Sequence, residues 1–265
     1  MSTPKQKISA LIITYNEIGY IEQCIDSVLF ADEIIVVDSY STDGTYEYLQ
    51  NHPKVTVIQH PFKNFTAQKA FTLKQAKNDW VLFLDADEVV SNELKEEIEK
   101  TINCNQNHVA YWFYKKFMFK NEPLSFSGWQ TDKNYRLFRK SKVRFCEKRI
   151  VHETLHVDGT SGVFQKKLTH YCYKDYASYR TKVLSYGRLK AIEAFKTNKK
   201  FNYHLFFLKP IWKFFHSYIL RLGILDGKKG YVVCKLDALC YVELYRELQK
   251  LEREEKWTAV FKTFP

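Results

Sequence analysis

The sequence predicts an α/β protein with a mostly parallel central sheet, helices on both faces of that sheet, and a helical C-terminal extension. Three observations lead to this fold class. Short β-branched and aliphatic runs alternate with segments of helical spacing over the first 110 residues. Polar side chains directly follow several of these runs, and helical spacing dominates from about Tyr176 onward. Strand–helix alternation at this pitch is typical of a parallel sheet.

The first part of the chain contains four expected strands and four expected helices. The strands are the apolar runs 8–14, 34–37, 55–58 and 80–84. The helices are 19–29, 45–50, 65–77 and 92–102, and Thr42 or Asp43 is expected to cap the second of them. Short runs rich in Ile and Val suit strands that are buried on both faces.

The middle of the chain has a different pattern. Longer strands with alternating aromatic residues are expected at 109–119 and 135–139, followed by a strand at 150–153 and a turn at Asp158–Gly159. We therefore expect an α/β domain over residues 1–175 and a helical extension over residues 176–265.

Charge is divided unevenly along the chain. The 265 residues carry a net charge of +11. Residues 1–110 hold 9 Lys and Arg against 16 Asp and Glu, whereas residues 111–265 hold 32 Lys and Arg against 14 Asp and Glu. An acidic half that could hold a metal thus precedes a basic half that could meet phosphate-rich partners. The alternative is that the basic residues only solubilise the surface. Nucleic acid is not an expected partner, because no nucleic-acid-binding module is recognisable.

The cysteines and the hydropathy pattern indicate a reducing, cytoplasmic setting. The six cysteines are scattered and form no C-x-x-C pair, so neither a zinc site nor a redox motif is expected. The N-terminal residues lack the architecture of a signal peptide. No run of about 18 uncharged apolar residues occurs, so no membrane-spanning helix is expected.

Polar residues follow three of the expected strands. They are Thr14-Tyr15-Asn16-Glu17, Asp38-Ser39 and Asp85-Ala86-Asp87. In open α/β sheets, ligands bind outside the carboxyl ends of the strands. The convergence of three such ends on one edge predicts a binding site there.

Asp85 and Asp87 are the strongest candidates for a cation site. On an extended segment, residues i and i+2 point to the same side, and Ala86 keeps the position between them small. Two carboxylates could then share Mg²⁺ or Mn²⁺, with positions left for phosphate oxygens. The alternative is a surface turn that caps the next helix.

Asp38 and its neighbours suit a nucleotide. A carboxylate at the end of a second strand commonly accepts hydrogen bonds from ribose or base, although Asp38 could simply order the following turn. Neither G-x-G-x-x-G nor a Walker phosphate loop occurs, which disfavours hydride transfer and P-loop phosphoryl transfer. Without a glycine-rich cradle, a diphosphate needs metal and side chains, and Lys69 is a candidate helper.

The ordered motifs resemble those of family 2 glycosyltransferases of the GT-A fold. TYNE, VVDSYSTDGT and LDADE carry the resemblance, which is closest to the branch that adds glucose to the lipopolysaccharide inner core. That branch also shows an F-x-A-Q-K helix (65–69), Y-R-L-F-R (135–139), V-H-E (151–153) and L-D-G-x-x-G (225–230). The likeness covers roughly residues 8–245. Tyr40 departs from it, because the family commonly has a small residue there.

The resemblance implies an inverting, metal-dependent transferase that takes a hexose from a UDP-sugar, with glucose from UDP-glucose as the first expectation, to a glycan or glycolipid acceptor. It implies a nucleotide-binding half over about 1–110 and an acceptor half over about 111–175. The expected nucleotide-sugar residues are Thr14, Tyr15, Asn16, Glu17, Asp38, Ser39, Lys69, Asp85 and Ala86. Asp87 would hold the divalent cation, with His152 or His170 completing its sphere.

Glu153 is the expected catalytic base, and Glu88 is its rival, which could instead orient the loop. Trp129, Arg136 and Arg139 are expected to border the acceptor, because an aromatic face packs on sugar and Arg pairs with phosphate. Two other functions remain open. Asp85 could be the nucleophile of a haloacid-dehalogenase-like phosphohydrolase, or the basic half could serve a non-catalytic nucleotide- or polyanion-binding protein.

The segment 210–225 carries an apolar stripe of Ile211, Phe214, Phe215, Tyr218, Leu222 and Leu225. Its basic flanks suit the headgroup region of an anionic inner membrane surface. A helix packed on the catalytic domain, or a contact between two copies, would explain the same stripe.

Overall fold

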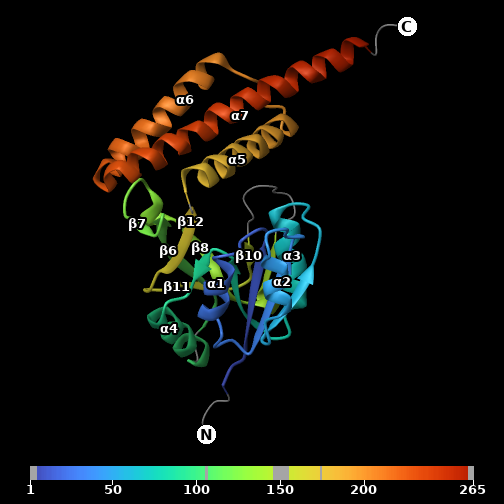
Figure 1. The fold of residues 1–265 in the computed structure, drawn as a ribbon, viewed down its shortest axis with the longest axis vertical. Helices are drawn as coiled ribbons and strands as arrows, with labels where there is room; N and C mark the ends of the chain where they lie inside the picture. Colours follow the sequence, from blue (N-terminus) through green and yellow to red (C-terminus); the bar gives the residue numbers. More distant parts are fainter. Residues whose placement is uncertain (1–4, 105–106, 146–154, 174, 262–265) are drawn as a thin grey trace. The chain divides into compact units, whose positions relative to one another are not determined.

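A computed structural model describes residues 5–104, 107–145, 155–173 and 175–261. The chain divides into two compact units. The first comprises Met1–Phe117 and Thr131–Tyr171, and the second comprises Met118–Gln130 and Cys172–Pro265. Figure 1 shows the fold of each unit, and each is described by itself below.

The first unit has the parallel sheet that the sequence predicts. Strands β1 (Ile8–Thr14), β2 (Glu33–Asp38), β3 (Val55–Gln59) and β4 (Trp80–Asp85) alternate with helices α1 (Ile21–Ser27), α2 (Thr45–Gln50) and α3 (Phe65–Gln75). β1 pairs in parallel with both β2 and β4, and β2 pairs in parallel with β3. The predicted mostly parallel fold class is therefore confirmed.

The remaining strands extend the sheet in a mixed arrangement. They are β5 (Glu88–Val89), β6 (His108–Phe119), β7 (Glu122–Leu124), β8 (Lys133–Arg139), β11 (Thr160–Val163) and β12 (Leu168–Tyr173). The strand order is β3-β2-β1-β4-β8-β6-β12-β5, with β7 and β11 also paired to β6. β8 is antiparallel to both β4 and β6. A small separate sheet joins β9 (Val143–Phe145) to β10 (Leu155–Val157).

Both faces of the parallel sheet are buried, which explains why its strands read as continuous apolar runs. Ala10 and Ile12 of β1 belong to a core shared with α1, α2 and the helix α4 (Asn92–Asn103). The alternate residues Leu11 and Ile13 belong to a second core, which includes Leu73 of α3. Successive residues of one strand thus serve opposite layers.

Local differences from the sequence-based expectations have simple causes. The expected cap of α2 at Thr42 or Asp43 is wrong: Gly44 precedes the helix with a φ of 95°. The Asp43 carboxylate instead accepts the N–H and hydroxyl of Thr45 at 3.1 Å and 2.6 Å. The expected strand 150–153 lies outside the described residues. Asp158 and Gly159 form the expected bend between β10 and β11.

The second unit is mainly helical. Helices α5 (Tyr176–Lys196) and α6 (Tyr203–Phe215) both lie against the long helix α7 (Gly227–Phe261), as Figure 1 shows. Short helical turns are η1 (Trp129–Thr131) and η2 (Lys140–Lys142) earlier in the chain, and η3 (His216–Leu220) and η4 (Gly223–Asp226) between α6 and α7. Among the residues described, no helix combines the length and apolarity needed to cross a membrane.

The L-D-G-x-x-G stretch builds the turn that enters α7. The Asp226 carboxylate accepts the backbone N–H groups of Ser125 and Phe126 at 3.0 Å and 2.9 Å. A Cβ atom on Gly230 would lie 1.9 Å from the carbonyl oxygen of Gly223, so only glycine fits there. Asp226 and Gly230 therefore have a structural role that explains their place in the motif.

Candidate active site

The parallel register brings the three predicted strand ends to one edge of the first unit. Thr14 at the end of β1 is paired with Asp38 at the end of β2. On the other side of β1, Ile13 is paired with Asp85 at the end of β4. Because neighbouring strands lie about 5 Å apart, polar residues from three chain segments share this edge.

The segment after β1 is held by the loop after β2. Asn16 has a φ of 56°, and its N–H donates to the Ser41 hydroxyl at 2.9 Å. Its side-chain oxygen accepts the Thr42 N–H at 2.8 Å, and the Glu17 N–H donates to the Thr45 hydroxyl at 3.0 Å. The amide and backbone groups of this segment therefore fix the loop, while the Tyr15 side chain is exposed.

Asp38 is fully buried, and its carboxylate orders its own turn. It accepts the N–H of Ser41 at 3.0 Å and the Ser41 hydroxyl at 2.5 Å. The neighbouring Ser39 hydroxyl accepts a hydrogen bond from the Gln68 amide of α3 at 3.0 Å. A nucleotide that reached the Asp38 carboxylate would have to take the place of Ser41.

Asp85 and Glu88 belong to a network with three cationic side chains. An Nη atom of Arg136 on β8 lies 2.5 Å from Asp85 and 2.6 Å from Glu88. Lys69 on α3 lies 3.3 Å from Asp85, and Lys115 on β6 lies 3.0 Å from Glu88. These residues come from five elements, so the sheet topology itself assembles the network.

The network keeps both carboxylates charged. Burial opposes ionisation, but Arg136 and Lys69 hold the pKa of Asp85 well below its usual value. Burial likewise opposes ionisation of Glu88, and Arg136 and Lys115 lower its pKa. Within this network three cations face two carboxylates.

Glu88 orients the turn after β4. Its carboxylate accepts the backbone N–H of Asp85 at 3.1 Å, and its side chain is completely buried. A catalytic base must reach the acceptor hydroxyl, and Glu88 has neither the exposure nor an unpaired oxygen for that task. The sequence left Glu88 open as a rival base; the geometry assigns it to the loop.

Asp87 lies next to His170. Ala86 and Asp87 form a turn, so the extended geometry expected for Asp85-x-Asp87 does not occur. Instead, β12 pairs with β5 and places the His170 Nε2 atom 3.2 Å from an Asp87 carboxylate oxygen. Both side chains are mostly buried.

A carboxylate and an imidazole side by side fit a divalent cation of the Mn²⁺ type, whose ligands include both groups. In the described part of the chain, no three His, Cys, Asp or Glu side chains are grouped to enclose a metal. Asp87 and His170 could therefore supply two ligands, and the others would have to be water or the phosphates of a donor.

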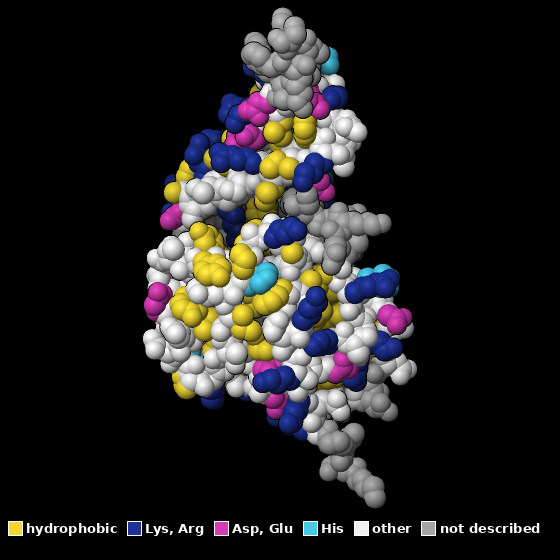
Figure 2. Space-filling view, turned by 90° about the vertical axis from the view of Figure 1, so that its right-hand side faces the viewer, with side chains coloured by type: hydrophobic (Ala, Val, Ile, Leu, Met, Phe, Trp, Pro, Cys, Tyr) yellow, Lys and Arg dark blue, Asp and Glu magenta, His cyan; other side chains and the backbone are white. Residues whose placement is uncertain are grey.

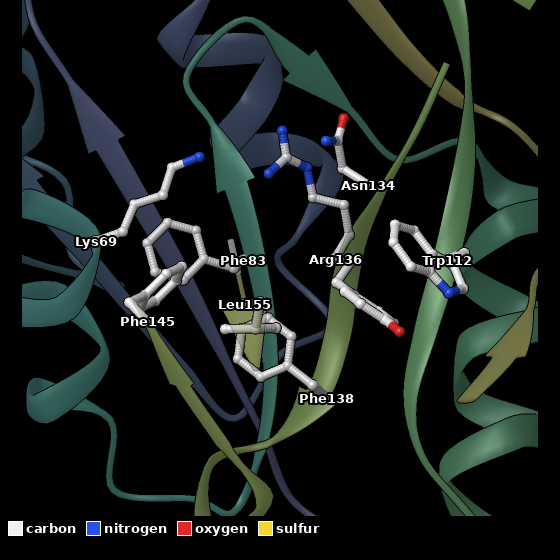
Figure 3. A pocket seen from close by; sticks show the side chains of 9 residues that line it. Lys69, Phe83, Trp112, Asn134, Arg136, Phe138, Phe145 and Leu155 are labelled. Carbon is white, nitrogen blue, oxygen red and sulfur yellow. The ribbon is translucent and has the colours of Figure 1, made fainter. Parts of the chain in front are cut away.

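A cavity of about 260 Å³ lies beside the network. In Figure 3, Lys69, Arg136 and Asn134 place their polar ends at one end of it. Phe83, Phe138, Phe145 and Leu155 line the other end. A second cavity, of about 450 Å³, shares Tyr135 and Leu155 with the first and includes Arg144 and His156.

Several predicted site residues fall outside this assembly. Glu153 and His152 lie outside the described residues. Arg139 sits at the far end of β8, paired in register with Trp80 at the start of β4, and lies 3.2 Å from Asp79. Trp129 belongs to the second unit. Of the three expected acceptor residues, the first unit brings only Arg136 to the strand ends.

The sequence reasoning missed Lys115 and Trp112, which both lie on β6. The Trp112 ring stacks on Tyr135, with centroids 3.7 Å apart, at the wall of the first cavity. The aromatic alternation over 109–119 was a usable signal for the strand. Which of its residues faces the network depends on the pairing with β8, which includes an irregularity between Tyr111 and Trp112.

Comparison with known proteins decides the family. The model of the glycosyl transferase family 2 matches residues 9–185, which include every strand end and network residue above. The chain is a family 2 glycosyltransferase. It is 33% identical over 243 residues to an uncharacterized glycosyltransferase of Rickettsia bellii (strain RML369-C), covering 86% of this chain and 81% of that one.

Two further proteins are similar to this glycosyltransferase, one in sequence and one in fold. It is 29% identical to the lipopolysaccharide core biosynthesis glycosyltransferase LpsC of Rhizobium meliloti (strain 1021), covering 84% of this chain and 83% of that one. The mannosyltransferase PcManGT of Pyrobaculum calidifontis shares the fold, with a TM-score of 0.51, 13% identity and coverage of 93% and 88%. Family membership answers the alternatives left open by the sequence: the protein is a glycosyltransferase, not a phosphohydrolase or a non-catalytic binding protein.

Proposed function

We propose that this glycosyltransferase transfers a hexose, glucose in the first instance, from a UDP-sugar to a cell-envelope glycan such as the lipopolysaccharide inner core. The observation that carries the proposal is the meeting of polar residues from β1, β2 and β4 beside a cationic network. The cationic side chains of Lys69 and Arg136 next to these strand ends suit the diphosphate of a sugar nucleotide. The similarity to LpsC, whose name refers to the lipopolysaccharide core, supports the acceptor class.

The donor would lie along the strand ends. Tyr15 offers an exposed ring to the base, and Asp38 with Ser39 would meet the nucleoside once Ser41 moves aside. Thr14, Asn16 and Glu17 would shape this site through the loop they build. Lys69 and the Asp85-Ala86 segment would face the diphosphate.

Asp87 and His170 would hold a divalent cation, Mg²⁺ or Mn²⁺. When bound, the cation would supply positive charge that stabilises the departing nucleoside diphosphate. The mannosyltransferase that shares the fold was solved in complex with GDP-Man and Mn²⁺, which supports testing manganese first.

The proposed reaction is a direct displacement. The acceptor oxygen forms a bond to the anomeric carbon while the bond from that carbon to the diphosphate breaks, and UDP leaves with the electron pair. Glu153 would take the proton of the acceptor hydroxyl. Attack from the face opposite the leaving group inverts the anomeric configuration. Leu155, two positions after Glu153, lines both cavities, which supports placing the acceptor there.

The donor is tested by calorimetric binding and nucleotide-release assays with UDP-, GDP- and TDP-sugars, each with Mn²⁺, Mg²⁺ or a chelator. We expect UDP-glucose to bind and react with a metal present. Turnover of a different sugar nucleotide, with UDP-glucose inert, would make the donor assignment wrong. Asp87→Asn should lower metal-dependent turnover, whereas Asp26→Asn on the exposed side of α1 should not.

The base is tested with a core oligosaccharide acceptor. Glu153→Gln should keep donor binding and lower transfer by a factor on the order of 10² or more. Proton NMR of the product should show the inverted anomer. Full transfer by Glu153→Gln, or a product with retained configuration, would contradict the mechanism. That this glycosyltransferase works in the cytoplasm is a prediction from the sequence.

A further inference from the structure

The outer side of α6 exposes an unusual row of large apolar side chains. Leu208, Ile211 and Trp212 are 61%, 66% and 57% exposed, and Leu205, Phe215 and Ile219 are also exposed. Their spacing by threes and fours places them on one helical face. The turn after α6 continues the row with Leu220, Leu222, Ile224 and Leu225, all of them exposed. We call these ten residues the α6 face.

The orientation of this face is fixed by packing. On the other side of α6, Pro210 is buried, and Ser217 of η3 is 1% exposed. Phe206 packs against a cluster that includes Tyr245 and Leu248 of α7. The Asn202 side chain caps the helix by accepting the Leu205 N–H at 3.0 Å. The helix is thus held against α7 with its apolar residues turned outward.

An apolar stripe on a helix usually packs on the protein core, but much of this one faces outward. Ser217, which is not part of the stripe, is buried against the protein, whereas Ile211, Phe215 and Leu225 of the stripe are exposed. Monomeric soluble proteins rarely expose contiguous apolar patches larger than a few hundred Å². A patch of this kind marks an interaction surface.

The residues around the α6 face are strongly basic. Residues 199–235 contain eight Lys and Arg and one acid, Asp226, whose carboxylate accepts backbone N–H groups. Three of the eight lie against acids of other elements: Lys200, Lys213 and Lys229 are 3.7, 3.7 and 3.0 Å from Glu255, Asp237 and Glu122. Figure 2 shows Lys and Arg side chains spread over the side of the molecule that lies at the right of Figure 1. Near the α6 face itself, Lys209, Lys228 and Lys235 are exposed. An anionic surface would complement this charge.

Length and composition favour a surface location over a spanning one. The 13 residues of α6 extend about 20 Å, which is shorter than the roughly 30 Å of a bilayer core. Trp212, Tyr203 and Tyr231 are exposed aromatic residues of the types enriched where hydrocarbon meets headgroups. Apolar residues backed by lysines are typical of helices that lie in that interface.

A second copy of the chain fits this surface less well. A two-fold interface brings the same patch of each subunit together, so the lysines of both copies would face one another. Such juxtaposition of like charges opposes association. We propose that the α6 face docks on a bilayer of anionic phospholipids, with its apolar side chains entering the headgroup boundary. This proposal goes beyond the sugar-transfer reaction, and its test needs neither donor nor acceptor.

The test is flotation of the full chain with vesicles of phosphatidylcholine, with or without phosphatidylglycerol. The wild type should float with the phosphatidylglycerol vesicles, less so at high salt, and not with phosphatidylcholine alone. The double variant Ile211→Ser/Trp212→Ser should lose at least about tenfold in affinity. Lys209→Gln and Lys228→Gln should each lower it about fivefold.

Ile192→Ser provides the matched control, because Ile192 is exposed on α5, outside the α6 face. It should bind vesicles like the wild type, and circular dichroism should show all variants folded. Absence of wild-type binding, equal binding by the Ile211→Ser/Trp212→Ser variant, or equal binding to neutral vesicles would overturn the proposal. A lipid-free dimer that this double variant dissociates in sedimentation equilibrium would assign the face to a second copy.

Discussion

Arg136 and Arg139 lie three residues apart on β8, and the structure predicts very different costs for removing them. The Arg136 side chain is 5% exposed and contacts both Asp85 and Glu88. The Arg139 side chain is 34% exposed, lies 3.2 Å from Asp79 and stacks over the Trp80 ring. Each arginine can be replaced by Met, which preserves much of the apolar stem.

The expected magnitudes follow from burial. Removing one partner of a buried ion pair costs about 3–5 kcal/mol, because the remaining charge stays buried without compensation. Lys115 remains 3.0 Å from Glu88, so Arg136→Met should fall near the lower end, about 3 kcal/mol. An exposed ion pair contributes about 1 kcal/mol or less, and an exposed cation–π contact a similar amount. Arg139→Met should therefore cost about 1 kcal/mol.

Urea unfolding at neutral pH, followed by circular dichroism, measures both free energies of unfolding. A double-mutant cycle identifies the cause. If the loss comes from the contact between Arg136 and Glu88, Arg136→Met should cost less stability in a Glu88→Met background than in the wild type. Equal costs for the two arginine variants, or full additivity with Glu88→Met, would refute the reasoning.

Three further predictions concern pH, packing and backbone strain. Burial would raise the pKa of Glu33, but hydrogen bonds from the Lys77 N–H and the Ser9 hydroxyl lower it below its usual value. The ionised Glu33 carboxylate therefore stabilises the folded protein above the pKa that Glu33 has in the unfolded chain. This contribution to the free energy of unfolding is lost as pH falls through the lower pKa of the folded state. The stability gap between wild type and Glu33→Gln in urea titrations should close in acid, and a constant gap would contradict this. Gly230→Ala should destabilise by about 3 kcal/mol or more through overlap with the preceding turn. Gly227→Ala has open space but a φ of 63° and a ψ of −138°, a conformation that L residues rarely adopt, and should cost about 1–3 kcal/mol. A larger loss of melting temperature for Gly227→Ala than for Gly230→Ala would be the opposing result. Tyr40 has a φ of 62° and is exposed, so Tyr40→Gly should change stability by less than about 1 kcal/mol yet raise the KM for the donor, and an unchanged KM would show that its ring does not contact the donor.

The sequence was sufficient for the fold of the first unit because burial on both faces imposes a simple pattern. Strands such as Ile8–Thr14 are buried at every position and therefore mostly apolar, and each must end where the sheet meets solvent. The polar residues after each strand are therefore visible as abrupt changes in composition. Parallel pairing then brings Thr14, Asp38 and Asp85 to the same edge without any further information.

The partners of these polar residues could not be predicted in the same way. Glu88 contacts Lys115 and Arg136, which lie on other strands, and His170 reaches Asp87 only because β12 pairs with β5. The turn at Ala86–Asp87 also invalidates the period-two rule that would have aimed both aspartates the same way. Spacing along the chain carries no information on contacts that depend on the register of distant strands.

The α6 face shows a different limit of sequence patterns. A stripe such as Ile211–Phe215 has the same period whether it packs on a core or faces a lipid headgroup layer, because both environments remove apolar area from water. The neighbouring small and polar residues are more informative. Ser217 and Gly223 are buried, and a Cβ atom on Gly223 would lie 2.5 Å from the Ser127 hydroxyl, so this side of the segment must pack closely on the protein. Once the small residues are assigned to the inner side, large apolar residues on the opposite side, such as Ile211 and Trp212, must face outward, and a helix with such an outer face is suited to a partner other than its own core.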